Sequence, residues 1–189
     1  GQHDLAAVVG HVHLHAALLV GQRHDGAHIF LRHVQVHRDD GLAHFLDAAL
    51  VGNIGDSFAK QVALDPRPLY VVEVSSFQLD DIVTFRPDIA ILTNITEDHL
   101  DRYEYRFENY IRSKFRITMN QQANDTFIYC ADDEVTMNYL NQYNIKSNQL
   151  PISMKRELPN GAFIKDGDMY VRTGQDFTTM SVFDFALKG

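Results

Sequence analysis

The chain of 189 residues is 45% hydrophobic, which is enough to bury the core of one domain and leaves little room for two. Its net charge of -8, without a stripe of clustered lysine and arginine, argues against nucleic acid as a partner. The single cysteine, Cys130, cannot form a disulfide within the chain, and neither a long apolar run nor a cleavable leader stands out. These features predict a cytoplasmic protein with no membrane partner.

Residues 1–50 differ in composition from the rest of the chain. They contain no Ser, Thr, Lys, Asn, Glu, Tyr, Pro, Met or Cys, and they hold nine of the ten histidines. Almost every residue in them can be written with a codon that begins with G or C. We therefore interpret residues 1–50 as a translation of the wrong frame or strand, or as a cloning scar, and set them apart from the domain predicted for residues 51–189.

The histidines of residues 1–50 support a second interpretation. His11, His13 and His15 alternate, so on a strand they would share one face, and neutral imidazole is a common ligand of zinc, copper and nickel. The segment lacks the cysteine or carboxylate spacing that makes zinc assignments specific. A non-catalytic, His-rich metal-binding protein is therefore an alternative function.

From Val51 onward, apolar runs alternate with segments of helical periodicity. Continuous apolar runs are typical of strands that are buried on both faces, and their alternation with helices indicates a parallel sheet. The expected strands are Leu69–Val74, Asp88–Asn94 and Thr126–Cys130, the expected helices Arg106–Gln122 and Asp132–Asn141, and the expected hairpin Ala162–Lys165 with Met169–Arg172. The predicted fold is α/β, with a mostly parallel sheet flanked by helices and short antiparallel strands near the C-terminus.

Polar side chains follow the first two expected strands. Glu73 interrupts an apolar run, where a carboxylate is unfavourable unless it is paired, protonated or bound to a cation. Asn94 ends the next strand, and Asp98 and His99 follow in a short polar turn. Since ligands bind at the carboxyl ends of parallel strands, these residues are predicted to face one crevice.

Two further features point to a chemical role. Lys114 shares the apolar stripe of its expected helix with Phe107, Tyr110 and Ile111, so it needs a partner or a modification. A desolvated lysine has a lowered pKa and supplies the free amine that reacts with carbon dioxide to form a carbamate. The turn Gly52-Asn53-Ile54-Gly55 permits close backbone approach to a ligand.

Taken together, four motifs resemble the middle domain of the Mur ligase family in order, spacing and residue type. They are Gly52-Asn53-Ile54-Gly55, Glu73-Val74-Ser75-Ser76-Phe77-Gln78-Leu79, Asn94 to Arg102 (Asn-Ile-Thr-Glu-Asp-His-Leu-Asp-Arg) and Tyr110 to Ile117 (Tyr-Ile-Arg-Ser-Lys-Phe-Arg-Ile). The similarity covers residues 51–189 and implies the P-loop-like fold of that domain. The Ser-Ser-Phe-Gln-Leu string is most similar to the D-glutamate-adding branch of the family.

The resemblance implies an ATP- and Mg²⁺-dependent ligase that phosphorylates the carboxylate of UDP-N-acetylmuramoyl-L-alanine and lets the amine of D-glutamate attack the acyl phosphate, in peptidoglycan precursor synthesis. Magnesium prefers hard oxygen ligands, which suits a carboxylate, a carbamate and phosphates. The implied roles are Mg²⁺ binding for Glu73, His99 and a carbamylated Lys114, catalysis for Lys114, His99 and the water-holding Asp98, cofactor binding for Glu73 and Asn94, and substrate binding for Asn53, Ser75 and Gln78.

One departure from the family pattern bears on activity. The family's phosphate loop, Gly-x-x-Gly-Lys-Thr or Ser, should precede Gly52, but no lysine occurs before Lys60 and no Ser or Thr before Ser57. We therefore expect a fragment with little or no ligase activity. A related amide-forming ligase such as a folylpolyglutamate synthase is a further alternative, which the Ser75-Ser76-Phe77-Gln78 string disfavours.

Overall fold

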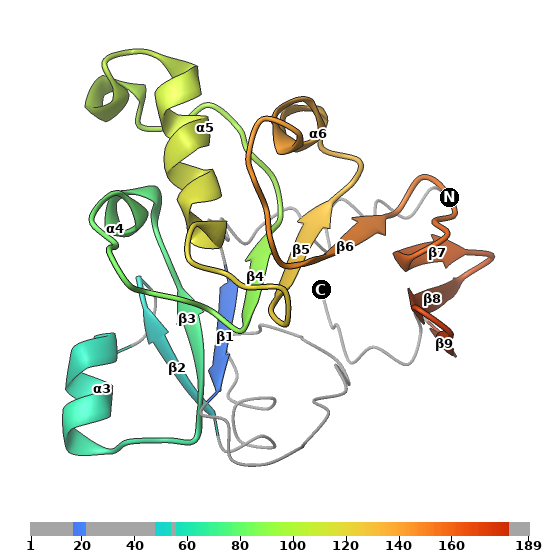
Figure 1. Ribbon diagram of the computed structural model, residues 1–189, viewed down its shortest axis with the longest axis horizontal. Coiled ribbons are helices and arrows are strands. Elements are labelled where there is room, and N and C mark those ends of the chain that lie inside the picture. The colour runs from blue at the N-terminus through green and yellow to red at the C-terminus, as the bar shows by residue number, and fades with distance from the viewer. Residues whose placement is uncertain (1–16, 22–47, 54–55, 182–189) are drawn as a thin grey trace.

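The computed structural model describes residues 17–21, 48–53 and 56–181. One nine-stranded sheet in the order β2-β3-β1-β4-β5-β6-β7-β8-β9 runs through this part of the chain (Figure 1). Its strands are β1 (Ala17–Gly21), β2 (Ala48–Gly52), β3 (Leu69–Glu73), β4 (Ile89–Leu92), β5 (Thr126–Cys130), β6 (Asn148–Ser153), β7 (Gly161–Lys165), β8 (Asp168–Thr173) and β9 (Asp176–Ser181). The helices are α3 (Phe58–Leu64), α4 (Ser76–Asp80), α5 (Phe107–Phe115) and α6 (Glu134–Leu140), with 3₁₀ turns η1 (Leu100–Tyr103) and η2 (Arg116–Thr118).

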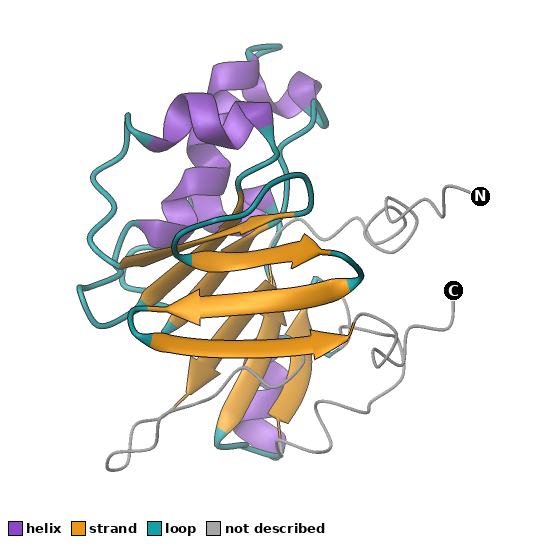
Figure 2. Ribbon diagram, turned by 90° about the vertical axis from the view of Figure 1, so that its right-hand side faces the viewer, coloured by secondary structure: helices purple, strands orange, loops and turns teal. Residues whose placement is uncertain are grey.

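The sheet contains two groups of parallel strands and ends in antiparallel strands. β2 pairs with β3, and β4, β5, β6 and β7 pair in turn, all in parallel. β7, β8 and β9 then form an antiparallel meander, which lies in front in Figure 2. The predicted fold class is confirmed, including the hairpin near the C-terminus. Its turn uses Asp166 and Gly167 at φ 52° and 86°, the positive values that a tight hairpin turn requires.

The strand β1 separates β3 from β4 and is antiparallel to both. It lies within residues 1–50, and β2 begins at Ala48, so the segment with the unusual composition contributes backbone to the sheet. The boundary drawn at residues 50 and 51 therefore falls inside β2. Whether residues 1–50 are a separate unit stays a prediction.

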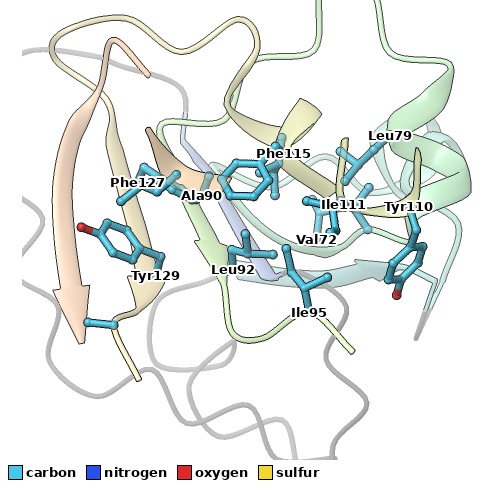
Figure 3. Packing of buried hydrophobic residues seen from close by; sticks show 14 of the residues in the cluster. Val72, Leu79, Ala90, Leu92, Ile95, Tyr110, Ile111, Phe115, Phe127 and Tyr129 are labelled. Atoms are coloured by element: carbon cyan, nitrogen blue, oxygen red, sulfur yellow. The ribbon is translucent and has the colours of Figure 1, made fainter. Parts of the chain in front are cut away.

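The core lies between one face of the sheet and the helices α4 and α5. Alternate residues of β3, Tyr70 and Val72, point to this face with Val74 just beyond them, whereas Leu69 and Val71 pack on the other. In Figure 3, Ile111 and Phe115 of α5 lie against the strand residues Val72, Ala90 and Phe127. Phe115 also stacks on Tyr143 with ring centroids 4.2 Å apart.

Several expected element boundaries were wrong. The helix expected over Arg106–Gln122 ends at Phe115 and tightens into η2, because Asn120 and Gln121 leave the helix to bind backbone carbonyls. The helices α3 and α4 and the parallel strand β6 were not predicted. The two helices have seven and five residues, too few to show a helical period. No helix in the described residues is both long and apolar enough to cross a membrane.

Gln121 provides a test of the polar interior. It is fully buried, its amide donates to the carbonyls of Pro87 (3.1 Å) and Thr126 (3.0 Å), and it accepts from Ser147 Oγ (2.9 Å). Replacing Gln121 by Leu leaves these three groups unsatisfied, so we expect the free energy of unfolding to fall by about 3 kcal/mol in urea denaturation. Gln122→Leu at the exposed neighbour is the matched control, with an expected change below about 0.5 kcal/mol. Equal effects of the two substitutions would contradict the role assigned to Gln121.

Candidate functional site

Glu73 and Asn53 meet at the carboxyl ends of β3 and β2. Gly52 is the register partner of Glu73 in the parallel pair, so the strand ends are level. The Asn53 amide N–H donates to the Glu73 carbonyl (2.9 Å), and Asn53 Nδ2 donates to Glu73 Oε1 (3.2 Å). Gly52 has φ 115°, a backbone conformation that side chains disfavour, and this turn brings Asn53 over Glu73. The predicted partners Ile54 and Gly55 lie outside the described residues.

The Glu73 carboxyl group is the outstanding polar group of the interior. It is 4% exposed, and its Oε2 is buried without a hydrogen-bond partner among the described residues. Burial raises its pKa, while the Asn53 hydrogen bond and the charge of Lys114 act in the opposite direction. A buried carboxylate oxygen that no protein donor satisfies is the kind of oxygen that a hard cation takes as a ligand. The site therefore fits a divalent cation at Glu73.

Lys114 is buried, as its place on the apolar stripe of α5 predicts. It is 1% exposed, and its Nζ lies 5.2 Å from the centroid of the Tyr110 ring. Burial lowers the Lys114 pKa to about 8, against the charges of Asp98 and Glu73, which favour the ammonium form. A substantial fraction of Lys114 is therefore an uncharged, nucleophilic amine at mildly alkaline pH.

Asp98 and His99 form a local pair in the loop after β4. Asp98 Oδ1 accepts from the His99 amide N–H (2.8 Å), and Asp98 Oδ2 lies 3.4 Å from His99 Nε2. His99 has φ 49° where η1 begins, and its ring packs against that of Phe77 with centroids 5.1 Å apart. In the same loop the exposed Asn94 accepts from Thr93 Oγ1 (3.2 Å). The strained backbone at His99 turns its imidazole toward α4.

Ser75 and Gln78 hold the start of α4 by reciprocal hydrogen bonds. Ser75 Oγ accepts from the Gln78 amide N–H (3.3 Å), and Gln78 Oε1 accepts from the Ser75 amide N–H (2.9 Å), which is a capping box. The structure thus gives both residues a role in starting the helix directly after Glu73. Their predicted contact with substrate stays a prediction.

The structure brings some of the predicted residues together and leaves others apart. The charges of both Glu73 and Asp98 act on Lys114, so the three belong to one electrostatic unit. Within the described residues, no three His, Cys, Asp or Glu side chains form a group that could hold a metal ion by themselves. A cation at Glu73 would therefore need at least one ligand of another kind in addition to these side chains.

Asp133, which the sequence did not single out, supports the same edge of the sheet. Its Oδ2 accepts from the Ile95 amide N–H (3.4 Å), from the Thr136 amide N–H (2.8 Å) and from Thr136 Oγ1 (2.6 Å). It thereby caps α6 and tethers the loop that carries Asp98 and His99. The pair Asp132-Asp133 directly follows the apolar run of β5, and the strand-end pattern that identified Glu73 could have found it.

Comparisons with known proteins identify the family of the chain. Residues 57–187 match the family described as "Mur ligase middle domain". The chain is 47% identical over 144 residues to a UDP-N-acetylmuramoylalanine--D-glutamate ligase of Christiangramia forsetii, covering 76% of the chain and 32% of that relative. A protein of the same name from Porphyromonas gingivalis is 50% identical over 115 residues, which cover 61% of the chain and 26% of that relative. Another from Bacteroides fragilis is 45% identical over 126 residues, which cover 67% of the chain and 28% of that relative. The chain thus spans at most about a third of these relatives.

Gly52→Ala tests the close approach of β2 to β3. A Cβ at Gly52 would lie 2.2 Å from the Glu73 carbonyl oxygen, and the φ of 115° is strained for any residue with a side chain. We expect the free energy of unfolding to fall by about 3 kcal/mol in urea denaturation. Gly174→Ala is the matched control, because Gly174 also has a positive φ (65°) but a Cβ there meets no described atom within 4 Å. The expected loss of unfolding free energy for Gly174→Ala is about 1 kcal/mol. Equal losses in the two variants would show that the clash with Glu73 contributes nothing.

Lys114→Met tests the electrostatic penalty of the buried amine. Between pH 10.5 and pH 8 Lys114 is protonated in the unfolded chain but largely unprotonated in the folded chain. The free energy of unfolding of the wild type therefore falls as the pH is lowered through this range, and Lys114 causes no further loss below it. At about 1.4 kcal/mol per pH unit, the variant should be more stable by about 3 kcal/mol at pH 7, and this gain should vanish toward pH 10.5. Urea denaturation across this pH range measures the difference.

Lys60→Met at an exposed position is the control for Lys114→Met, since its side chain is 60% exposed and should give no such pH dependence. A Lys114→Met gain that stays constant from pH 7 to pH 10.5 would show that the amine is not desolvated.

Proposed function

The chain belongs to the Mur ligase family through its middle domain, and on this premise we propose that it is the middle part of an ATP-dependent ligase that joins D-glutamate to UDP-N-acetylmuramoyl-L-alanine. The names of its relatives support this choice of substrates, and the product is a precursor of peptidoglycan. The observation that carries the proposal is the unsatisfied, buried oxygen of Glu73 beside a buried lysine. Such a ligase would work in the cytoplasm, where ATP and both substrates are present.

Glu73, His99 and Lys114 are the residues that would hold Mg²⁺. The fit is best at Glu73, whose Oε2 needs a partner, while His99 is a less typical ligand for a cation that prefers oxygen. Bound magnesium would screen the negative charge that accumulates when a carboxylate approaches the phosphates of ATP. Asn94, in the loop after β4, would bind the nucleotide together with Glu73.

Lys114 would act as a carbamate. Its uncharged amine adds to the carbon of CO₂, a C–N bond forms, and one N–H proton is lost to solvent, which leaves an anionic oxygen ligand on a helix that is otherwise apolar. Burial supports this step because it lowers the Lys114 pKa to about 8, so that more of the amine is deprotonated and has a free lone pair. The modification also turns a disfavoured buried cation into a group that suits magnesium.

The reaction would proceed in two transfers. An oxygen of the substrate carboxylate attacks the γ-phosphorus of ATP, ADP leaves, and an acyl phosphate forms. The amine of D-glutamate then attacks the acyl carbon, the tetrahedral adduct loses inorganic phosphate and a proton, and an amide remains. Asn53, Ser75 and Gln78 would orient the substrate, and Asp98 would hold a water and keep His99 in place. Positioning and electrostatics carry most of such a reaction.

The test is a ligase assay on the product of the complete gene, with ADP release followed by a coupled enzyme. We expect release that requires both UDP-N-acetylmuramoyl-L-alanine and D-glutamate. Lys114→Ala should reduce the rate at least about 100-fold, and a short carboxylic acid such as propionate should restore part of it by replacing the carbamate oxygens. Lys60→Ala is the control and should leave the rate unchanged.

Two outcomes would overturn the proposal. ADP release with a folate substrate and glutamate, but not with the muramoyl substrate, would identify a folylpolyglutamate synthase-like ligase instead. Absence of any Gly-Lys-Thr or Gly-Lys-Ser loop in every frame of the DNA before codon 51, together with tight zinc binding by the chain, would favour the His-rich metal-binding protein.

A further inference from the structure

Tyr103 lies at the junction of η1, α4 and α5. It is 6% exposed, and its hydroxyl oxygen lies 3.0 Å from Asp80 Oδ2 on α4 and 3.3 Å from Ser113 Oγ on α5. Ser113 Oγ in turn donates to the Ser76 carbonyl at 2.7 Å. Burial raises the pKa of the Tyr103 hydroxyl, so the group stays a donor throughout the neutral range. These contacts link α5 to α4 next to Lys114, the residue that follows Ser113.

The ring of Tyr103 reaches both functional side chains through two other aromatic residues. It stacks on Phe77 (centroids 6.1 Å apart, planes at 13°) and meets Tyr110 edge-on (5.3 Å, 68°). Phe77 is the ring that packs against His99, and Tyr110 is the ring beneath the Lys114 amine. Tyr103 therefore contacts one ring that packs against His99 and one ring that lies beneath the Lys114 amine.

The two ends of α5 are held by different contacts. At its start, Asn109 Nδ2 donates to the Tyr103 carbonyl (3.2 Å), and Tyr110 and Ile111 are buried in the core. The N-cap residue of α5, Arg106, makes no side-chain capping bond, and the two residues before it, Glu104 and Tyr105, have φ of 57° and 54°. The C-terminal end is held separately by Arg116, which donates to the carbonyls of Leu79 (2.6 Å) and Ile82 (2.9 Å). Lys114 lies between the Ser113 contacts and Arg116. Loss of the Tyr103 hydroxyl should therefore loosen the contact of Ser113 with α4 next to Lys114, while Arg116 and the buried residues keep the helix in place.

We propose that Tyr103 is a positioning residue, whose hydroxyl and ring together hold Lys114 beside the carboxylates of Glu73 and Asp98 and keep the His99 ring against Phe77. The functional meaning of this role rests on the proposed ligase activity, in which Lys114 and His99 serve the metal site. The positional claim itself concerns only the folded chain.

Amine labelling of the chain tests the positional claim. The protein is treated with a small amine-reactive reagent at fixed pH, and the rate at each lysine is read by peptide mass spectrometry, with the exposed Lys60 and Lys165 as internal references. Tyr103→Phe keeps the ring and removes only the hydroxyl, so the fold should survive. We expect Lys114 to react about fivefold faster in this variant while the reference rates stay unchanged, since opening then breaks one net hydrogen bond fewer.

The matched control is Tyr105→Phe, which removes a 79% exposed hydroxyl two residues away and should change nothing. Ser113→Ala should raise the Lys114 rate as Tyr103→Phe does. Because both act through one contact network, the double variant should react no faster than either single one, whereas independent loosening would multiply the two effects.

A second readout reports the position of the side chain rather than its exposure. With ¹³C-labelled lysine, a fixed Lys114 beside the Tyr110 ring gives two separate, shifted Hε signals, which should merge in Tyr103→Phe and remain separate in Tyr105→Phe. An unchanged Lys114 rate and unchanged Hε signals in a folded Tyr103→Phe variant would overturn the proposal. So would a wild-type Lys114 that reacts as fast as Lys60.

These measurements need no nucleotide, metal or substrate. A negative ligase assay with a positive labelling result would therefore reject the proposed function and keep the positioning role. An active ligase whose Lys114 is equally protected in Tyr103→Phe would do the reverse.

Discussion

The burial of an amine and a carboxyl group in one apolar interior is the constraint on which the rest of the candidate site depends. Lys114 and Glu73 are 1% and 4% exposed, and neither charge is favourable there without compensation. Burial favours the neutral form of each group, so it raises the pKa of Glu73 and lowers the pKa of Lys114. Groups with such shifted pKa values are concentrated at functional sites, which is why these two residues mark the candidate site.

The sheet explains how the polar groups around Glu73 are placed. Strands β2 and β3 run parallel with level ends, so Asn53 reaches Glu73 through both its backbone and its side chain. The loop after β4 brings Asp98 and His99 to the same edge, and Asp133 fixes that loop from the end of β5. The capping box of α4 begins two residues after Glu73 and sets the direction in which the helix leaves it. Short polar segments thus owe their positions to hydrogen bonds between loops.

The helical layer supplies the other half of the site. Tyr103 and Ser113 join α4 to α5, Phe77 supports His99, and Tyr110 lies under Lys114. Aromatic contacts and two hydroxyl groups therefore surround Lys114 and His99 on the side of the helices. The motif residues indicate which chemical groups are present, whereas the contacts between the helices determine where these groups lie.

The sequence by itself determined the α/β class, the buried strands, the hairpin and the burial of Lys114, because apolar periodicity and turn residues act over short distances along the chain. It also identified Glu73, whose charge stands out in an apolar run, and the family to which the motifs belong. Only the tertiary structure decided where α5 ends, that Ser75 and Gln78 cap α4, and that Asp133 and Tyr103 support the site. Those features depend on hydrogen bonds and ring contacts between residues distant in sequence or in elements too short to show a period, and such contacts leave no periodic signal.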